Sequence, residues 1–244
     1  MFPMIHLNET DSTNNYLKEL LADTRLSEFT VVCADFQSTG RGQRDSDGWE
    51  SRKGKNLLFS LVLYPHEIEV EQQFVISQIV ALAIKDVLNE YTADITIKWP
   101  NDIYWKDKKI CGILIENSLI DDRIAQSVIG VGLNLNQQEF QSKAPNPVSL
   151  LQITGQEYDR DLILSSIVEK IKHYYSALKS GGQQSIHKNY KASLFRNEGY
   201  HSYRDDKGDF EACIKDISLM GYLTLEDKNH SIRQYAFKEV KYIL

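Results

Sequence analysis

Two segments rich in β-forming residues, 29–37 and 56–64, enclose a stretch that has almost no apolar side chains. This stretch, residues 38–55, carries four glycines and many charged residues, so it predicts a long surface loop between two buried strands. Long loops without secondary structure inside compact domains are usually functional. The loop is therefore the first candidate for a functional segment.

The rest of the first 195 residues alternates helical and extended patterns. Apolar residues recur with a helical period over 70–91, whereas 94–100 alternates as a strand that Pro100 ends. The sequence predicts three further helices and a strand pair: helices over 13–22, 159–179 and 183–195, and strands over 109–118 and 123–135.

The tail, residues 197–244, differs from the rest of the chain. Short β-like runs are separated by turn signals such as DDKGD and EDKNH, which predicts a small barrel or sheet. We place a domain boundary near 195–199, which divides the chain into domains 1–196 and 197–244. A domain this short has little core of its own, so we expect it to lean on the first domain.

Composition excludes several classes of protein. The formal net charge is −6, from 34 acidic and 28 basic residues, which argues against a nucleic-acid partner. No apolar run reaches the roughly 18 residues that span a membrane, and the N-terminus lacks the features of a secretory signal. Cys33, Cys111 and Cys213 suit neither a disulfide framework nor a zinc site. We therefore expect a cytoplasmic protein with no membrane partner.

Within the loop, residues 39–44 place a glycine on each side of Arg41. Glycines let backbone N–H groups approach an anion, and the arginine fork binds carboxylate or phosphate. A solvated, flexible loop accounts for these residues equally well. Neither of the two familiar nucleotide-binding signatures, G-x-G-x-x-G and G-x-x-x-x-G-K-[ST], is present.

Residues 98–102, KWPND, end a strand and then offer an amide and a carboxylate. Pro-Asn-Asp is also ordinary turn chemistry. A turn does not explain Lys98 at the end of an apolar strand, because a buried ammonium is costly unless an anion meets it. The segment is therefore a candidate for binding an anionic ligand.

Glycines interrupt the two strands of the predicted pair, at Gly112 and at Gly130 and Gly132. Close approach of a ligand would account for the missing side chains, and so would tight sheet packing. Residues 11–15, DSTNN, are typical of a helix N-cap but could also bind a polar, uncharged group. Together these segments describe a pocket for a ligand with a neutral polar head, a carboxylate and a phosphate.

The chain resembles the biotin–protein ligases over residues 10–136. The motifs that carry the resemblance occur in one order: DSTN (11–14), GRGQR (40–44) with Trp49, KWPND (98–102), KKICGILIE (108–116) and GVGLNLN (130–136). The resemblance implies an α+β fold, in which a mixed sheet flanked by helices, of the class II synthetase type, precedes a small SH3-like β-barrel. It also implies that biotin is activated by ATP to biotinyl-5′-AMP and then transferred to a lysine of a biotin carboxyl carrier protein.

The resemblance also assigns roles to individual residues. Catalytic roles fall to Lys109, Arg41 and Asp102. Biotin binding falls to Ser12, Thr13, Asn14, Gln37, Arg41, Gly42, Gln43, Lys109 and Gly112. ATP binding falls to Arg44, Trp49, Lys98, Asn101 and Asn134. Mg²⁺ would offset the triphosphate charge, held mainly by phosphates and water rather than by protein ligands, and the loop 38–55 would close over the ligands.

The sequence departs from the family pattern in the loop, where Asp45 replaces a glycine and one extra residue precedes Trp49. Only ten residues precede DSTN, so we expect no N-terminal helix-turn-helix domain and a purely enzymatic role. A lipoate or octanoate ligase is one alternative, but its Arg-Arg and triple-glycine signature is absent. A non-catalytic biotin-sensing module is another, which the basic set of Arg41, Lys98 and Lys109 disfavours. Exposed strand edges could pair two subunits, but nothing in the sequence specifies a homodimer.

Overall fold

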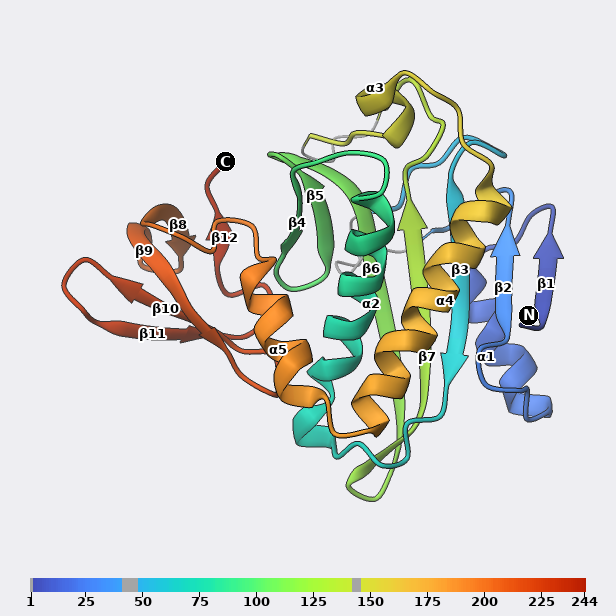
Figure 1. The fold of residues 1–244 in the computed structure, drawn as a ribbon, viewed down its shortest axis with the longest axis horizontal. Coiled ribbons are helices and arrows are strands. Elements are labelled where there is room, and N and C mark those ends of the chain that lie inside the picture. The colour runs from blue at the N-terminus through green and yellow to red at the C-terminus, as the bar shows by residue number, and fades with distance from the viewer. Residues whose placement is uncertain (1, 41–47, 142–145) are drawn as a thin grey trace.

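The computed structural model describes residues 2–40, 48–141 and 146–244. Two sheets organise this part of the chain, a mixed sheet of seven strands and an antiparallel sheet of five (Figure 1). Helices flank the larger sheet, and the smaller sheet is built entirely from the C-terminal segment. The predicted α+β class, a mixed sheet with helices followed by a small β domain, is confirmed.

The larger sheet has the strand order β1-β2-β3-β7-β6-β5-β4. Only β1 and β2 run parallel, and the other neighbours are antiparallel. The strands are β1 (Met4–Leu7), β2 (Val31–Ala34), β3 (Leu57–Leu63), β4 (Ile95–Lys98), β5 (Asp102–Trp105), β6 (Lys108–Ile120) and β7 (Arg123–Leu133). The β6–β7 hairpin runs through the middle of the sheet, so the glycines of both strands lie at its centre.

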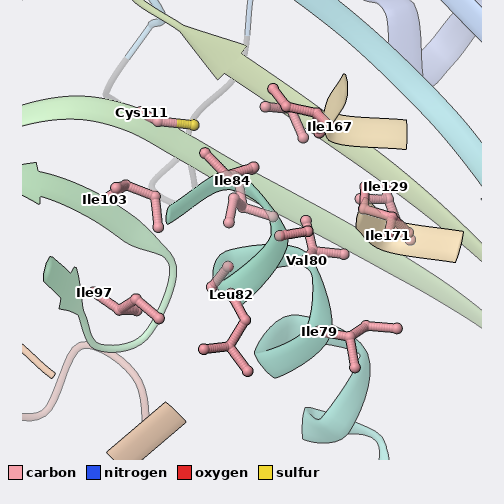
Figure 2. Close-up of a cluster of buried hydrophobic side chains, with 14 of the residues drawn as sticks. Ile79, Val80, Leu82, Ile84, Ile97, Ile103, Cys111, Ile129, Ile167 and Ile171 are labelled. Carbon is pink, nitrogen blue, oxygen red and sulfur yellow. The ribbon is translucent and has the colours of Figure 1, made fainter. Parts of the chain in front are cut away.

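Helices cover both faces of this sheet. The helices are α1 (Thr13–Asp23), α2 (Phe74–Leu88, after the short η1, Val70–Gln72), α3 (Leu150–Thr154), α4 (Arg160–Lys179) and α5 (Gln183–Ala192). Helix α2 is apolar on nearly every side because it lies between the sheet and the helices α4 and α5. Figure 2 shows its isoleucines interleaved with Ile129 of β7 and Ile167 and Ile171 of α4.

The second face of the sheet is covered by α1. Its Leu17 packs with Val32, Val62 and Val128 in a separate small core. Because α1 contacts β2, β3 and β7, its first residues lie beside the centre of the sheet, next to the glycines of the hairpin. This position brings the DSTNN segment close to strands that lie far from it in the sequence.

The C-terminal sheet has the strand order β11-β10-β9-β8-β12. Its strands are β8 (His201–Asp205), β9 (Gly208–Ile217), β10 (Leu223–Asp227), β11 (Ile232–Tyr235) and β12 (Lys241–Tyr242). Its buried residues, such as Tyr203 and Leu225, belong to the same continuous core as the large sheet and α2. The C-terminal domain therefore rests on the first one, and the division at 196/197 stays a prediction.

Within the described residues, no helix combines the length and the apolar character that crossing a bilayer requires.

Candidate active site

A hollow of about 510 Å³ lies beside the start of α1 and over the centre of the large sheet. It is bordered by segments that are widely separated in the sequence. Its lining comprises Ser12, Thr13, Asn14, Gln37, Trp49, Asn101, Lys109, Gly112, Ile113, Leu114, Gly130, Val131 and Gly132. Eight of the thirteen are residues that the family resemblance assigns to biotin or ATP, and the structure brings them together at one place.

A second hollow, of about 630 Å³, lies between the large sheet and the C-terminal domain. Its lining includes Phe74, Pro100, Ile115, Met220 and Phe237 and contains no charged side chain. A carboxylate or phosphate would meet no cation there. The hollow beside α1 is therefore the candidate active site.

Glycines form the floor of the site. Gly112 of β6 pairs directly with Gly132 of β7 across the hairpin, and Gly130 lies two residues further along β7. A Cβ at Gly130 would lie 2.3 Å from Oδ1 of Asn14, and one at Gly132 would lie 2.5 Å from Cε2 of the Trp49 indole. Side chains at these positions would collide with the walls, so the floor must consist of bare backbone.

One end of the hollow is a network of uncharged donors and acceptors. Gln37 Oε1 accepts hydrogen bonds from the backbone N–H of Thr13 at 2.7 Å and from its hydroxyl at 2.9 Å. The fully buried Ser60 hydroxyl lies 2.7 Å from Thr13 Oγ1 and 2.6 Å from Asn14 Oδ1, and its one proton serves both. Ser12 is the N-cap of α1, but its side chain makes no capping bond. This end suits a ligand that is polar and neutral.

The amide of Asn14 is fixed from its other side as well. Its Nδ2 donates to Glu116 Oε2 at 2.8 Å, and the Lys18 ammonium lies 2.7 Å from Glu116 Oε1. Because Ser60 holds the amide oxygen and Glu116 holds the amide nitrogen, the orientation of Asn14 is set before a ligand arrives. Such preorganisation lowers the entropic cost of binding.

Ser60→Ala is expected to lower the free energy of unfolding by about 1–3 kcal/mol and to weaken ligand binding, because it leaves buried oxygens of Thr13 and Asn14 without a donor. Thermal unfolding and calorimetric titration with biotin would measure the two effects. Ser118→Ala, in an exposed part of β6, is the matched control. A Ser60→Ala protein that equals the control in both measurements would show that this network does not order the site.

The opposite end of the hollow carries charge. The Lys109 ammonium lies 2.6 Å from Asp102 Oδ1, and the two side chains are 26% and 19% exposed. Lys109 follows the start of β6, and its backbone is held by Asn146 and Val148. Asp102 opens β5 directly across from Gly112, so the ion pair lies at the edge of the glycine floor. A cation is thus available where an anionic part of a ligand would lie.

Two residues predicted to bind ATP also line the hollow. The amide of Asn101 donates to the Ile113 carbonyl at 2.8 Å, which fixes the turn that leads into β5. The Trp49 indole lies over Gly112 and Gly132, with the Lys109 ammonium 5.7 Å from its ring centre. Its buried Nε1–H has no hydrogen-bond partner within the described part of the chain, which makes it a donor available to a ligand.

Two other predicted ATP-binding residues lie outside this lining. Asn134 is buried, and its amide donates to the Val148 carbonyl at 3.2 Å. The Lys98 ammonium donates to the Tyr104 hydroxyl at 2.9 Å and lies near the ring of Tyr242 in the C-terminal domain. Predictions for Arg41, Gly42, Gln43 and Arg44, and for the part of the closing loop at 41–47, concern positions outside the described residues.

Sequence reasoning missed Ser60 and gave no role to Glu116. Ser60 could have been found as the one hydroxyl residue inside the apolar run LLFSLVL, since a lone polar residue in a buried strand needs a partner. Glu116 lies within the KKICGILIE motif, but only the three-dimensional structure pairs it with Lys18 and Asn14.

The whole chain matches the structure of the Aquifex aeolicus biotin protein ligase in complex with biotin and ATP, with a TM-score of 0.81 and 26% identity, covering 100% of both chains. The model of the Biotin/lipoate A/B protein ligase family matches residues 7–134. The chain belongs to this family.

Curated relatives agree with this placement. The Bifunctional ligase/repressor BirA of Bacillus subtilis is 35% identical over 68% of this chain and 51% of its own length. The Biotin–[acetyl-CoA-carboxylase] ligase of Mycobacterium tuberculosis is 29% identical over 67% of this chain and 60% of its own length. The chain spans about half the length of the BirA proteins that it matches.

Proposed function

We propose that the chain is a biotin–protein ligase, which activates biotin with ATP to biotinyl-5′-AMP and transfers biotin to a lysine of a biotin carboxyl carrier domain. One observation carries the proposal: a single hollow has a fixed neutral network at one end and the Lys109–Asp102 ion pair at the other. Biotin has a neutral ureido ring at one end and a carboxylate at the other. Similarity to a ligase whose structure contains biotin and ATP supports the assignment.

The neutral network also distinguishes biotin from lipoate. The hollow offers hydrogen-bond donors and acceptors that match a ring carrying N–H and C=O groups, from Ser12, Thr13, Asn14 and Gln37. The dithiolane ring of lipoate makes no strong hydrogen bonds, so it would cover this network without bonding to any of its groups. Biotin is therefore the preferred substrate of the two.

In the proposed first step, a biotin carboxylate oxygen forms a bond to the α-phosphorus of ATP, and the bond from that phosphorus to the β-phosphate oxygen breaks. Pyrophosphate leaves with the electron pair. Two anions must meet for this to happen, and the Lys109 ammonium offsets their repulsion and the charge that develops on the α-phosphate. Arg41 is proposed to act from the other side, and Trp49 and Asn101 to hold the adenine.

In the second step, the neutral amine of the carrier lysine attacks the acyl carbon of biotinyl-5′-AMP. The C–O bond to the phosphate breaks, AMP leaves with the electron pair of that bond, and the proton that the nitrogen loses as the amide forms passes to Asp102. Asp102 is proposed to orient this amine and to take its proton, and the position of its carboxylate beside Lys109 supports this role. Exclusion of water by the surrounding groups protects the adenylate from hydrolysis.

Mg²⁺ is proposed to neutralise part of the triphosphate charge. Among the described residues, no group of three or more His, Cys, Asp or Glu side chains is arranged to hold a metal ion. The carboxylate nearest the floor, Asp102, is already neutralised by Lys109. These residues fit an ion that is held mainly by phosphates and water. We also propose a cytoplasmic location, since Cys33, Cys111 and Cys213 are all free thiols.

The test is exchange of labelled pyrophosphate into ATP, with biotin, with lipoate and with neither, followed by transfer to a carrier domain. The proposal expects exchange that depends on biotin, and labelling of the carrier that is lost when its target lysine is replaced by arginine. Exchange that depends on lipoate alone would identify a lipoate ligase. Biotin binding without any exchange would identify a sensing module.

A further inference from the structure

The segment Lys98–Asp102 touches two parts of the molecule at once. Its last two residues, Asn101 and Asp102, lie at the candidate active site. Its first two, Lys98 and Trp99, contact the C-terminal domain. A shift of the C-terminal domain against the large sheet would therefore reach the site through a main-chain segment of five residues, Lys98–Asp102.

Trp99 is held firmly by the C-terminal domain. The side chain is 3% exposed, and its indole N–H donates to the Gly221 carbonyl at 2.9 Å. Its ring meets Phe237 edge-on, with the ring centres 5.5 Å apart. Gly221 in turn lies so close to Phe74 of α2 that a Cβ on it would come within 2.6 Å of the Phe74 ring. The Gly221 carbonyl, which accepts the indole hydrogen bond, is therefore held in a fixed position by Phe74.

Lys98 is held between the two domains. Its ammonium donates to the Tyr104 hydroxyl at 2.9 Å and lies 4.6 Å from the centre of that ring. On its other side the ring centre of Tyr242, in β12, is 5.3 Å away. A cation is attracted to the face of an aromatic ring by the negative potential there. The ammonium therefore ties β5 of the large sheet to β12 of the C-terminal sheet.

The neighbouring strand β4 adds a backbone link at the same place. The N–H of Ile97 donates to the Ser193 carbonyl, and the N–H of Phe195 donates to the Ile97 carbonyl, at 2.8 Å each. The residues that lead into the C-terminal domain thus pair with the strand that leads into Lys98–Asp102. Side-chain and backbone contacts together fix this segment from the C-terminal side.

We propose that Lys98 and Trp99 are positioning residues, through which the C-terminal domain holds Asn101 and Asp102 in the geometry that the reaction needs. This inference rests on the proposed function, because it concerns the site of that reaction. It gives Lys98 a role other than the contact with ATP that the KWPND motif suggests. The physical basis is that small misplacements of reacting groups are costly: a shift of about 1 Å can reduce a rate by about 10²-fold.

The test compares Lys98→Met, Trp99→Phe and Tyr242→Leu in steady-state assays of biotin-dependent pyrophosphate exchange and of biotin transfer to a carrier domain. Each variant is expected to lower kcat for transfer about 10-fold to 100-fold, because Asp102 is proposed to orient the carrier amine. Each should also raise KM for ATP, because Asn101 is proposed to hold the adenine, while KM for biotin stays within about twofold of wild type. Lys98→Arg keeps the cation and should restore most of the rate. Trp105→Phe is the matched control: it makes the same change as Trp99→Phe, but at the end of strand β5. It should behave as wild type.

Tyr242→Leu is the decisive variant, because Tyr242 lies in the C-terminal domain and outside the hollow. If Lys98 acts through Tyr242, the double variant Lys98→Met/Tyr242→Leu should lose little more than either single variant. A raised KM for ATP in Lys98→Met, with Tyr242→Leu at the wild-type rate, would overturn the inference and return Lys98 to a nucleotide contact.

Retained biotin binding by calorimetry would show that each variant is folded. If Trp99→Phe fails this check, Lys98→Met and Tyr242→Leu still decide the question, since both change contacts at the domain boundary without removing the buried indole. Wild-type protein that shows no exchange would refute the proposed function. If the wild-type protein is active and the Lys98→Met and Tyr242→Leu variants are fully active too, only the positioning role is refuted.

Discussion

Lys109→Ala is expected to lower the rate of biotin-dependent adenylate formation by about 10²–10³-fold, because removing one group that stabilises developing charge typically has this effect. Lys109 supplies a cation at the charged end of the hollow, beside Asp102 and at the edge of the glycine floor. Biotin binding should weaken much less, since the neutral network that includes Gln37 and Thr13 remains intact. Single-turnover formation of biotinyl-5′-AMP and calorimetric titration with biotin would measure the two quantities.

The neighbouring lysine provides the control. Lys108 is exposed at the start of β6, so Lys108→Ala changes the net charge equally but leaves the site intact. Unchanged adenylate formation in Lys109→Ala, or a rate loss that Lys108→Ala shares, would show that the catalytic cation lies elsewhere.

The ion pair adds a second expectation. Lys109→Ala leaves the Asp102 carboxylate, 19% exposed, without the cation that lies 2.6 Å from it. That carboxylate would then repel the incoming carboxylate and phosphate. The double variant Lys109→Ala/Asp102→Asn should therefore form adenylate faster than Lys109→Ala alone. Equal rates would show that the Asp102 charge does not reach the reacting groups.

Sequence patterns predicted the long elements of the fold well. The helix expected over 70–91 is η1 followed by α2, and the one expected over 159–179 is α4 almost to the residue. A long run of residues with a helical apolar period is compatible with few secondary structures other than a helix. The elements missed were β1, β5, α3, β8 and β12, which have only two to five residues each. Strand β5 directly follows Pro100 and begins with Asp102, so turn signals conceal it.

The site was predicted less evenly than the fold. Glycines inside strands indicated close approach of other groups, and Gly130 and Gly132 do lie against Asn14 and Trp49. The family motif assigns Lys98, Asn101 and Asp102 of KWPND to the site. The structure places only its second half there, since Lys98 and Trp99 face Tyr242 and Gly221 of the C-terminal domain. Contacts with residues so distant in sequence follow from the packing of two domains, which no local pattern encodes.

Gly132→Ala is expected to weaken biotin binding by about 10-fold to 100-fold, since inserting a methyl group into a packed site costs about 1–3 kcal/mol and each 1.4 kcal/mol is a factor of ten. The added carbon would lie 2.5 Å from Cε2 and 2.8 Å from Cδ2 of the Trp49 indole. Gly112→Ala should have a smaller effect, because its added carbon comes no closer than 3.0 Å to the ring, at Cζ3, and 3.4 Å to Cε and Nζ of Lys109. Calorimetry with biotin, with unfolding temperatures as a check on the fold, would rank the two variants.

The added methyl group could weaken biotin binding in two ways, by displacing Trp49 or by occupying space that the ligand needs. A double variant distinguishes them. If the methyl group only displaces Trp49, then Gly132→Ala/Trp49→Ala should bind biotin as tightly as Trp49→Ala alone. If the ligand itself packs on the bare backbone of Gly112 and Gly132, the methyl group occupies its place whether or not the indole is present. We expect the second result, because the three glycines line the same hollow as the neutral network and the Lys109 ammonium. A ligand that spans from that network to that ammonium has to cross this floor.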